Sequence, residues 1–306
     1  MDESQVLSYK SLQVIPVVAD ESYLTRHAPL GHYTTLKEAM AAGTVSVTER
    51  VDDSRSNSGG ESVSTLYVEN TGDDTLFIMA GELVKGGRQD RVIARDFLLD
   101  PHSGKTDLSV FCVEHGRWTY NEAASYDLNL VGVQSTESKS LKFSSEGKVV
   151  SNKVRKTAMK DKNQSAVWDE VQVVTDKNGA GSSTGTYNAL DSSKTYTAQL
   201  DDYLGFFTGK FDASQNIVGV VVMSGGRVIG CDIFCKPDLF RREYSGLLNA
   251  YLAEVISGGG GEECNVEKAK EFFNKTLKEY SDPSDKSSDQ KLIHLGKVVH
   301  FSGFDS

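Results

Sequence analysis

The spacing of apolar residues changes midway along the chain, and this change constrains the fold more than any other feature. Apolar residues alternate with polar ones over 6–18, 45–47, 63–69, 75–79, 91–99 and 106–113, which is typical of short strands with one buried face. Beyond about residue 126 they thin to the helical spacing of Val150, Val154, Met159, Val167, Trp168 and Val171. The sequence therefore predicts a meander of antiparallel strands followed by a region rich in helices.

Local signals set the ends of individual elements. Pro16 indicates an edge position or a bulge in the first strand, and residues 70–74 predict a hairpin turn between two strands. A short helix over 36–42 is expected between a Thr34 or Thr35 cap and Gly43. Later elements are a helix near 200–207, a hairpin of 217–223 with 228–234, helices over 238–256 and 266–280, and a closing strand over 291–301.

Strands therefore occur at both ends of the chain, while helices collect in the second half. This arrangement favours an α+β fold over a doubly wound parallel sheet, in which strands and helices would alternate throughout. We expect a single domain over 1–306. In it, an antiparallel β-rich half (about 5–125) packs with a half made of helices, a β-hairpin and a closing strand (about 145–306).

The charge and the cysteines limit the classes of partner. The 306 residues carry a formal net charge of -10, so nucleic acid and anionic membranes are not expected as partners, and any anion site must be local. Cys112, Cys231, Cys235 and Cys264 lack the spacing of zinc knuckles or dithiol motifs, which favours a reduced compartment and no metal site. Because an export signal and a membrane-length apolar run are both lacking, we expect a cytoplasmic protein. The residues leave cofactors and oligomeric state open.

The first charged segment, residues 85–91, follows directly after an apolar run. Its paired glycines permit positive φ, so that successive amides can surround an anion. Lys85, Arg88 and Arg91 would supply positive charge, while Gln89 and Asp90 would read hydroxyl groups such as those of a ribose. The spacing is neither a P-loop nor a dinucleotide fingerprint. A turn with solvated charges remains an equal alternative.

The second charged segment is 114–118, which contains Glu114, His115, Arg117 and Trp118. Glu114 and His115 suggest an acid/base pair, Arg117 an anion contact, and Trp118 a surface for stacking a base. Adjacent strand residues point to opposite faces, however, which argues against a Glu114–His115 pair unless the chain turns at Gly116. A structural or solvent-facing role for His115, and a core role for Trp118, remain the alternatives.

Two further charged features have simpler explanations. Asp232 lies in an apolar strand and shares a face with Phe234, so it needs a partner: either an arginine from the first half or the helix that starts at Pro237. Structural pairing is the role that this pattern favours. The basic run from Lys153 to Lys162 is diluted by acidic residues and contains no interleaved aromatics, which predicts a solvated helix face.

Taken together, three segments resemble a bacterial family, the ARG and rhodanese-phosphatase-superfamily-associated proteins, where ARG stands for ADP-ribosylglycohydrolase. The similarity rests on residues 80–91, 111–118 and 230–234, with a weaker echo at 292–295. The resemblance implies the handling of NAD-derived nucleotides such as ADP-ribose. It implies roles for Glu82, Arg88, Gln89, Asp90, Arg91, Glu114, Arg117 and Trp118, and it joins the segment of Asp232 to the other two.

Two hypotheses follow. In the first, the segments converge on a pocket for a phosphorylated nucleotide of the ADP-ribose type, which the protein binds and could also process. Glu82 or Glu114 would then act as general base, and ligand contacts would come from Lys85, Arg88, Gln89, Asp90, Arg91, His115, Arg117, Trp118 and Asp232. In the second, the protein is a non-enzymatic scaffold, and these charges form an internal ion-pair network that joins the two halves. An open pocket would favour the first hypothesis and mutual saturation of the charges the second.

Overall fold

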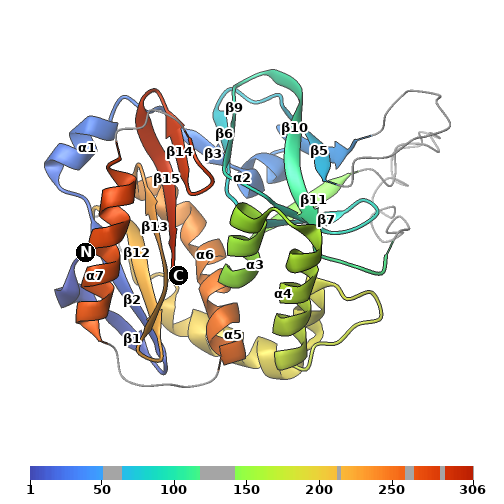
Figure 1. The fold of residues 1–306 in the computed structure, drawn as a ribbon. Coiled ribbons are helices and arrows are strands. Elements are labelled where there is room, and N and C mark those ends of the chain that lie inside the picture. Colours follow the sequence, from blue (N-terminus) through green and yellow to red (C-terminus); the bar gives the residue numbers. More distant parts are fainter. Residues whose placement is uncertain (51–63, 118–141, 212–214, 259–264, 283–286, 306) are drawn as a thin grey trace.

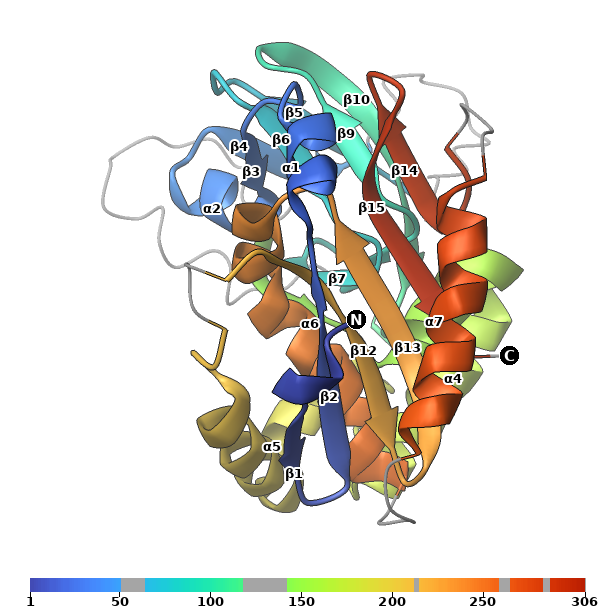
Figure 2. The ribbon, with the colours of Figure 1, turned by 90° about the vertical axis from the view of Figure 1, so that its left-hand side faces the viewer.

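The computed structural model describes residues 1–50, 64–117, 142–211, 215–258, 265–282 and 287–305. One of two six-stranded sheets is antiparallel throughout and joins the two ends of the described chain (Figures 1 and 2). Its order is β1 (Leu7–Tyr9), β2 (Leu12–Val18), β12 (Ile217–Ser224), β13 (Arg227–Phe234), β15 (Lys297–Phe304) and β14 (Lys291–His294). The first two strands thus join a sheet whose other strands come from the end of the chain.

A second sheet carries most of the remaining N-terminal strands. Its order is β11 (Phe143–Val149), β7 (Glu82–Gly86), β8 (Arg91–Ile93), β10 (Ser103–Cys112), β5 (Thr65–Asn70) and β4 (Val45–Glu49). A small third sheet contains β3 (Tyr33–Thr35), β6 (Thr75–Ile78) and β9 (Phe97–Leu99), of which β3 and β6 are parallel.

Helices cover both faces of the first sheet. The long helix α6 (Pro237–Gly258) packs on one face and also contacts β11 of the second sheet, while α7 (Val266–Tyr280) packs on the opposite face (Figure 2). The other helices are α1 (Glu21–His27), α2 (Leu36–Ala41), α3 (Asn152–Lys156), α4 (Gln164–Lys177) and α5 (Lys194–Phe207). Because α6 contacts strands of both sheets, it joins the first sheet to the second.

The expected α+β class is confirmed, and so are several element boundaries. Thr35 caps α2 in a capping box with Glu38, and Gly43 follows with a φ of 72°. The β12–β13 hairpin and the helices α5, α6 and α7 lie where the sequence predicts them. Pro16 lies beyond the part of β2 that β1 pairs with, which agrees with the expected edge position.

Other expectations about the strands were wrong. Residues 70–74 do not form a hairpin: β5 pairs with β4 and β10, whereas β6 pairs with β3 and β9 of another sheet. The side chain of Asn70 explains the connection, because its amide group donates to the carbonyls of Asp74 (2.9 Å) and Asp100 (3.1 Å) and ties the turn to the neighbouring loop. The predicted strand over 91–99 is two strands, β8 and β9, and the closing strand is the β14–β15 hairpin.

The helical region contains a strand and a buried cation that sequence reasoning did not foresee. β11 pairs with β7 directly before α3. The basic run that follows is not wholly solvated, because Arg155 is completely buried, and a π-helical turn at Thr157–Asp161 continues α3.

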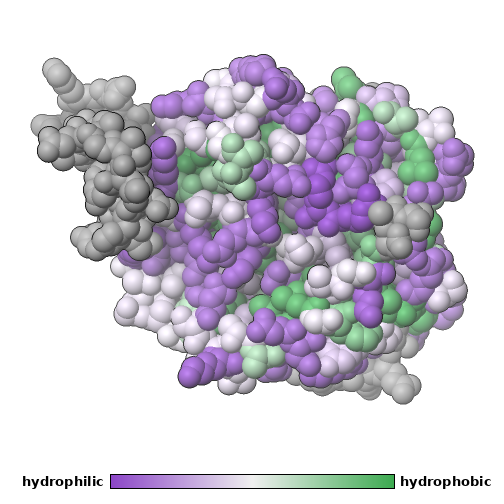
Figure 3. All heavy atoms as spheres, turned by 180° about the vertical axis from the view of Figure 1, so that it is seen from behind, coloured by the Kyte–Doolittle hydropathy of each residue, from purple (hydrophilic) through white to green (hydrophobic). Residues whose placement is uncertain are grey.

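The face opposite to that seen in Figure 1 is predominantly polar. Figure 3, seen from behind, shows a largely hydrophilic face on which apolar residues form small patches. Among the residues that the structure describes, the large apolar side chains that stay exposed come from different parts of the fold: Val18, Val173, Leu277 and Leu295. No helix within the described ranges is both long and apolar enough to cross a membrane.

Candidate functional site

The connection between β7 and β8 is a tight turn that requires its two glycines. Gly86 has a φ of 139°, and a Cβ atom there would lie 2.4 Å from the carbonyl oxygen of Lys142. Gly87 has a φ of 50°, and its Cβ would lie 2.3 Å from Glu49 Oε1. Glycine is therefore needed both for the backbone conformation and for the close approach of neighbouring chains.

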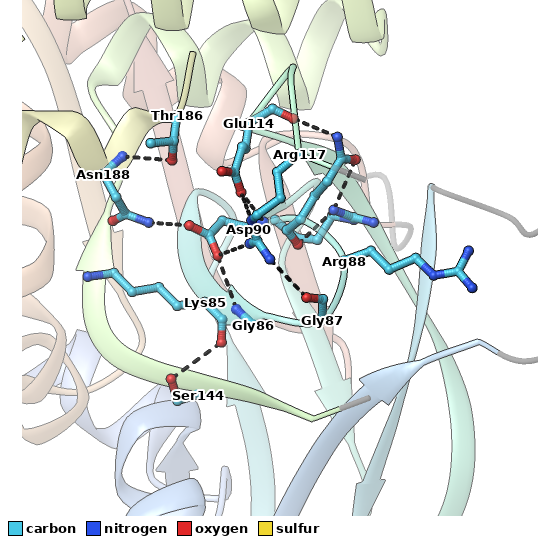
Figure 4. Close-up of polar contacts among 12 residues, drawn as sticks. Lys85, Gly86, Gly87, Arg88, Asp90, Glu114, Arg117, Ser144, Thr186 and Asn188 are labelled. Carbon is cyan, nitrogen blue, oxygen red and sulfur yellow. Dashed lines mark hydrogen bonds and ion pairs between the residues drawn. The ribbon is translucent and has the colours of Figure 1, made fainter. Parts of the chain in front are cut away.

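The two charged segments meet at this turn, in what we call the loop cluster: Gly86, Gly87, Asp90, Glu114, Arg117 and Asn188. Arg117 Nε lies 2.7 Å from Glu114 Oε2, and its Nη2 lies 3.2 Å from Asp90 Oδ1. Its Nη1 donates to the carbonyl oxygen of Gly87 at 3.0 Å. Figure 4 shows the guanidinium between the two carboxylates. The chain thus places a fixed cation, 15% exposed, beside the two-glycine turn.

Asp90 is the centre of the loop cluster. Its Oδ1 accepts from the Gly86 amide at 3.1 Å, and its Oδ2 accepts from the side-chain amide of Asn188 at 2.5 Å. Burial raises the pKa of Asp90, and the neighbouring Glu114 adds to this effect, while the Gly86 amide, Asn188 and Arg117 oppose it. Asn188 lies shortly after Thr186, which forms an antiparallel bridge with Glu114 of the second charged segment. No motif of the sequence pointed to this asparagine.

Gln89 and Arg91 lie behind the loop cluster rather than in it. Gln89 is fully buried, and its side-chain amide donates to the backbone carbonyl of Glu114 at 2.8 Å. Arg91 is also buried: its Nη1 donates to the Gln89 carbonyl at 2.7 Å, and its Nη2 lies 3.8 Å from Glu49 Oε1. These two buried residues thus hydrogen-bond to the backbone of the two segments from the interior of the protein.

Lys85, Arg88 and His115 point elsewhere. Lys85 Nζ lies 3.2 Å from Glu146 and 3.3 Å from Asp191, and the side chain of Arg88 extends away from Asp90 (Figure 4). His115 is exposed, and its ring meets Trp168 edge to face at 4.4 Å. It therefore forms no pair with Glu114, as the strand periodicity indicated. Trp118 lies outside the described residues.

Glu82 and Asp232 belong to a second group of polar and charged residues. We call it the buried network, and its members are Glu82, Asp96, Arg155, Asp232, Glu243, Tyr251, His300 and Ser302. A strand rises about 3.3 Å per residue, so Glu82 lies about 13 Å from Gly86 at the other end of β7. The structure thus brings Glu114 to the loop cluster but not Glu82 or Asp232.

The buried network joins the second sheet to the first. Asp232 on β13 lies 2.9 Å from Arg155 Nη1, and its carboxylate also accepts from Ser302 Oγ (2.9 Å) and from the hydroxyl of Tyr251. His300 on β15 bridges the two aspartates, at 3.1 Å from Asp232 and 2.6 Å from Asp96. The partner of Asp232 is therefore an arginine of α3, which was neither of the two partners that the sequence suggested.

Charge in the buried network is balanced. Burial disfavours a charged His300, but Asp96 and Asp232 outweigh it and raise its pKa to about 9. Burial would likewise raise the pKa of Asp232, yet Arg155, His300 and Tyr251 hold it well below its usual value. Two cations thus face two carboxylates, which is the condition under which buried charges are tolerated.

Two glutamates complete the buried network without balancing charges. Burial, together with Asp96, raises the pKa of Glu82 to about 8, against a hydrogen bond from the Met79 amide. Burial and the nearby Glu82 raise the pKa of Glu243 well above its usual value. Both are therefore neutral acids at pH 7. Within the described residues, no group of three or more histidine, cysteine or acidic side chains is placed to hold a metal ion.

Comparison with known proteins gives one result. No curated protein and no solved structure is significantly similar to the chain. The profile of the ARG and Rhodanese-Phosphatase-superfamily-associated Protein domain, ARPP-1, matches residues 2–304. The match covers nearly the whole chain, including the loop cluster and the buried network, and the protein therefore belongs to the ARPP-1 family.

Proposed function

We propose that the protein binds a phosphorylated, NAD-derived nucleotide of the ADP-ribose type at the loop cluster. The observation that carries this proposal is the convergence of the two charged segments on Arg117, which Asp90 and Glu114 hold beside the Gly86–Gly87 turn. A fixed guanidinium is suited to a phosphate because its orientation is set before the ligand arrives. The family description, which names an association with ARG proteins, supports the same ligand class.

The other residues of the loop cluster would then contact the sugar. Asn188 and Asp90 present an amide and a carboxylate side by side, a combination suited to ribose hydroxyls. Arg88, which extends away from Asp90, would reach a second phosphate. If the nucleotide is processed, the reaction would be hydrolysis or transfer at the ribose or pyrophosphate, with Glu114 as general base.

The test is calorimetric titration with ADP-ribose, NAD, AMP and simple sugars. We expect saturable binding of ADP-ribose, weakened at least about tenfold by Arg88→Ala and by Arg117→Lys, since lysine lacks the planar fork of arginine. The matched control is Arg95→Ala, which removes an exposed arginine just after β8 and should leave binding unchanged. Absence of saturable binding by any of these compounds would contradict the proposal.

A non-enzymatic scaffold is the second candidate, and one observation favours it. The guanidinium of Arg117 already contacts two carboxylates and a carbonyl of its own chain, so pairing alone accounts for these residue types. Under this alternative, Arg117→Lys, Arg117→Ala and Arg88→Ala mainly lower the melting temperature, and no nucleotide binds to the wild type or to the variants. Thermal-shift measurements on the three variants, with and without ADP-ribose, separate the two candidates.

A further inference from the structure

A second candidate site lies at the turn of the β12–β13 hairpin, away from the loop cluster. A cavity of about 320 Å³ opens between the start of α3, the end of α6 and the last residues of β15. A neighbouring cavity of about 400 Å³ shares Arg227 and Phe304 with it and extends to α7. We call the two cavities together the lysine groove. Their volumes fall in the range of small-molecule sites, about 300–1,000 Å³.

The described lining of the lysine groove is basic, although the whole chain carries a net charge of -10. Its cations are Lys153, Lys156, Arg227, Lys268 and Lys275, against the carboxylates Glu254, Glu271 and Asp305. Lys153 pairs with Glu254 at 3.1 Å. The other four cations of the lining form no ion pair with a residue that the structure describes. Local positive charge on an acidic protein is the condition that any anion site here must meet.

Crowding of the cations is visible in a neighbouring lysine. Lys160 stands over the ring of Phe304 at 5.7 Å, at the edge of the lysine groove. Burial lowers the pKa of Lys160, and the like charges of Lys156 and Lys275 lower it further, while Glu279 and Asp161 oppose the shift. An anion bound among these side chains would relieve their mutual repulsion.

Arg227 is the cation best placed to meet a ligand. The tight turn Gly225–Gly226, with φ values of 56° and 71°, carries it to the rim shared by both cavities. Its side chain is exposed and makes no hydrogen bond or ion pair with any residue that the structure describes. By contrast, Lys156 donates to the Asp305 carbonyl at 2.6 Å, and Lys268 donates to the Gly226 carbonyl at 3.4 Å.

A buried polar atom on the wall of the lysine groove indicates more than a bare anion. Asn152 is 5% exposed, and its amide nitrogen donates to the Ile229 carbonyl at 2.8 Å. Its Oδ1 atom is buried without a hydrogen-bond partner among the described residues. A buried acceptor without a partner is costly, so a small shift of the Asn152 side chain that lets a ligand donate to this atom would be favourable.

We infer that the lysine groove is a binding site for a sugar phosphate or nucleoside phosphate. The phosphate lies among Arg227, Lys153 and Lys156, a hydroxyl or amino group of the ligand donates to Asn152 Oδ1, and the half-buried ring of Phe304 provides an apolar contact. This inference is independent of the proposed function, because the two sites share no residue.

The inference is tested by calorimetric titration of the full chain with ribose 5-phosphate, AMP and inorganic phosphate. We expect ribose 5-phosphate and AMP to bind saturably, more tightly than inorganic phosphate, and to weaken as salt is added. Arg227→Gln should weaken binding at least about tenfold without lowering the melting temperature, because its side chain has no described partner. Lys153→Gln with Lys156→Gln should have a similar effect.

Two controls separate this site from the loop cluster. Arg26→Gln removes an exposed arginine of α1 and should leave both affinities unchanged. Arg117→Lys should leave binding of ribose 5-phosphate unchanged, whatever it does to ADP-ribose. The inference is overturned if neither compound binds, if binding persists in both groove variants, or if it is lost in Arg117→Lys instead.

A second measurement concerns Asn152. Replacement by leucine removes the buried acceptor. It should reduce the preference for ribose 5-phosphate over inorganic phosphate by about tenfold while leaving the weak binding of phosphate itself. An unchanged preference would overturn the role of the sugar or base in the inference.

Discussion

Arg155 shows how strongly a single residue can depend on its neighbours in this fold. Its guanidinium is completely buried, donates to Ser302 Oγ at 2.7 Å and to the Ala80 carbonyl at 2.9 Å, and forms an ion pair with Asp232. Nη1 faces the Asp232 carboxylate as an ion pair, without the alignment of a hydrogen bond. Removing the cation would leave that carboxylate buried and only partly compensated.

We therefore predict that Arg155→Met lowers the free energy of unfolding by about 3–5 kcal/mol, measured by urea denaturation at pH 7. The double variant Arg155→Met/Asp232→Leu keeps the charge balance and should recover part of this loss. Lys153→Met, two residues earlier and exposed, is the control and should change stability by less than about 0.5 kcal/mol. Equal stability of the Arg155 and Lys153 variants would contradict a cohesive role for the buried network.

The sequence shows that a residue such as Asp232 needs a partner, but it does not show which residue that partner is. Asp232 was expected to pair because a carboxylate in an apolar strand must be compensated, and it does pair. Its partner was not predictable, because Arg155 lies in a run of lysines that a single sequence cannot distinguish from a solvated face. Asp96, Asn188 and His300 carry no motif either, and only the fold brings them to their partners.

A helix and a strand approach each other closely where α6 crosses β11. A Cβ atom at Gly246 of α6 would lie 2.4 Å from the carbonyl oxygen of Gly147 on β11. Backbone at that distance cannot move aside as a flexible side chain would, so the helix and the strand would have to separate. By contrast, a Cβ at Gly205 of α5 would meet no atom within 4 Å.

This contrast gives a matched pair of substitutions in two helices. Gly246→Ala is expected to lower the free energy of unfolding by about 1–3 kcal/mol through overpacking. Gly205→Ala should raise it by about 0.5–1 kcal/mol, because alanine is the better helix former. Both are measured by urea denaturation; a Gly246→Ala variant as stable as the wild type would show that α6 does not press on β11.

The sequence predicts element boundaries correctly where local chemistry determines them. It does not predict which strands pair with one another. The capping box of α2 and the glycine turn of β12–β13 are local signals, and both elements lie where they were expected. The assignment of β5 and β6 to different sheets depends on Asn70 and on strands that arrive later in the chain. β11 was missed because only Phe143 and Val149 are buried in it, which leaves no alternating pattern.

The buried network joins the sheets of the molecule, and some of its groups differ in protonation between the folded and the unfolded chain. β1 and β2 lie in the sheet formed by the C-terminal strands, and the buried network joins that sheet to β7 and α3. Within this network His300 and Glu82 have raised pKa values, of about 9 and about 8 respectively. The folded chain therefore holds protons that the unfolded chain releases at a lower pH.

From this we predict that stability falls as the pH rises from about 6.5 to about 9. The contribution of His300 is complete below its unfolded pKa near 6.5 and is lost as the pH passes through about 9. That of Glu82 is complete below about 4.5 and is lost as the pH passes through about 8. Each proton released on unfolding changes the free energy of unfolding by at most about 1.4 kcal/mol per pH unit.

Urea denaturation at intervals between pH 5 and pH 9.5 measures this dependence. Glu82→Gln should reduce the part of the decline that begins below pH 6.5 without abolishing it, because Glu243 and Asp90 also have raised pKa values. It should keep the contribution of His300, because glutamine is neutral at every pH and His300 keeps both aspartates. Asp232, whose pKa is lowered, has the opposite sign and acts only at the acid end, outside this window. A free energy of unfolding that stays level or rises from pH 6.5 to pH 9 would show that His300 is neutral in the folded chain, and that the network joining the sheets lacks its second cation.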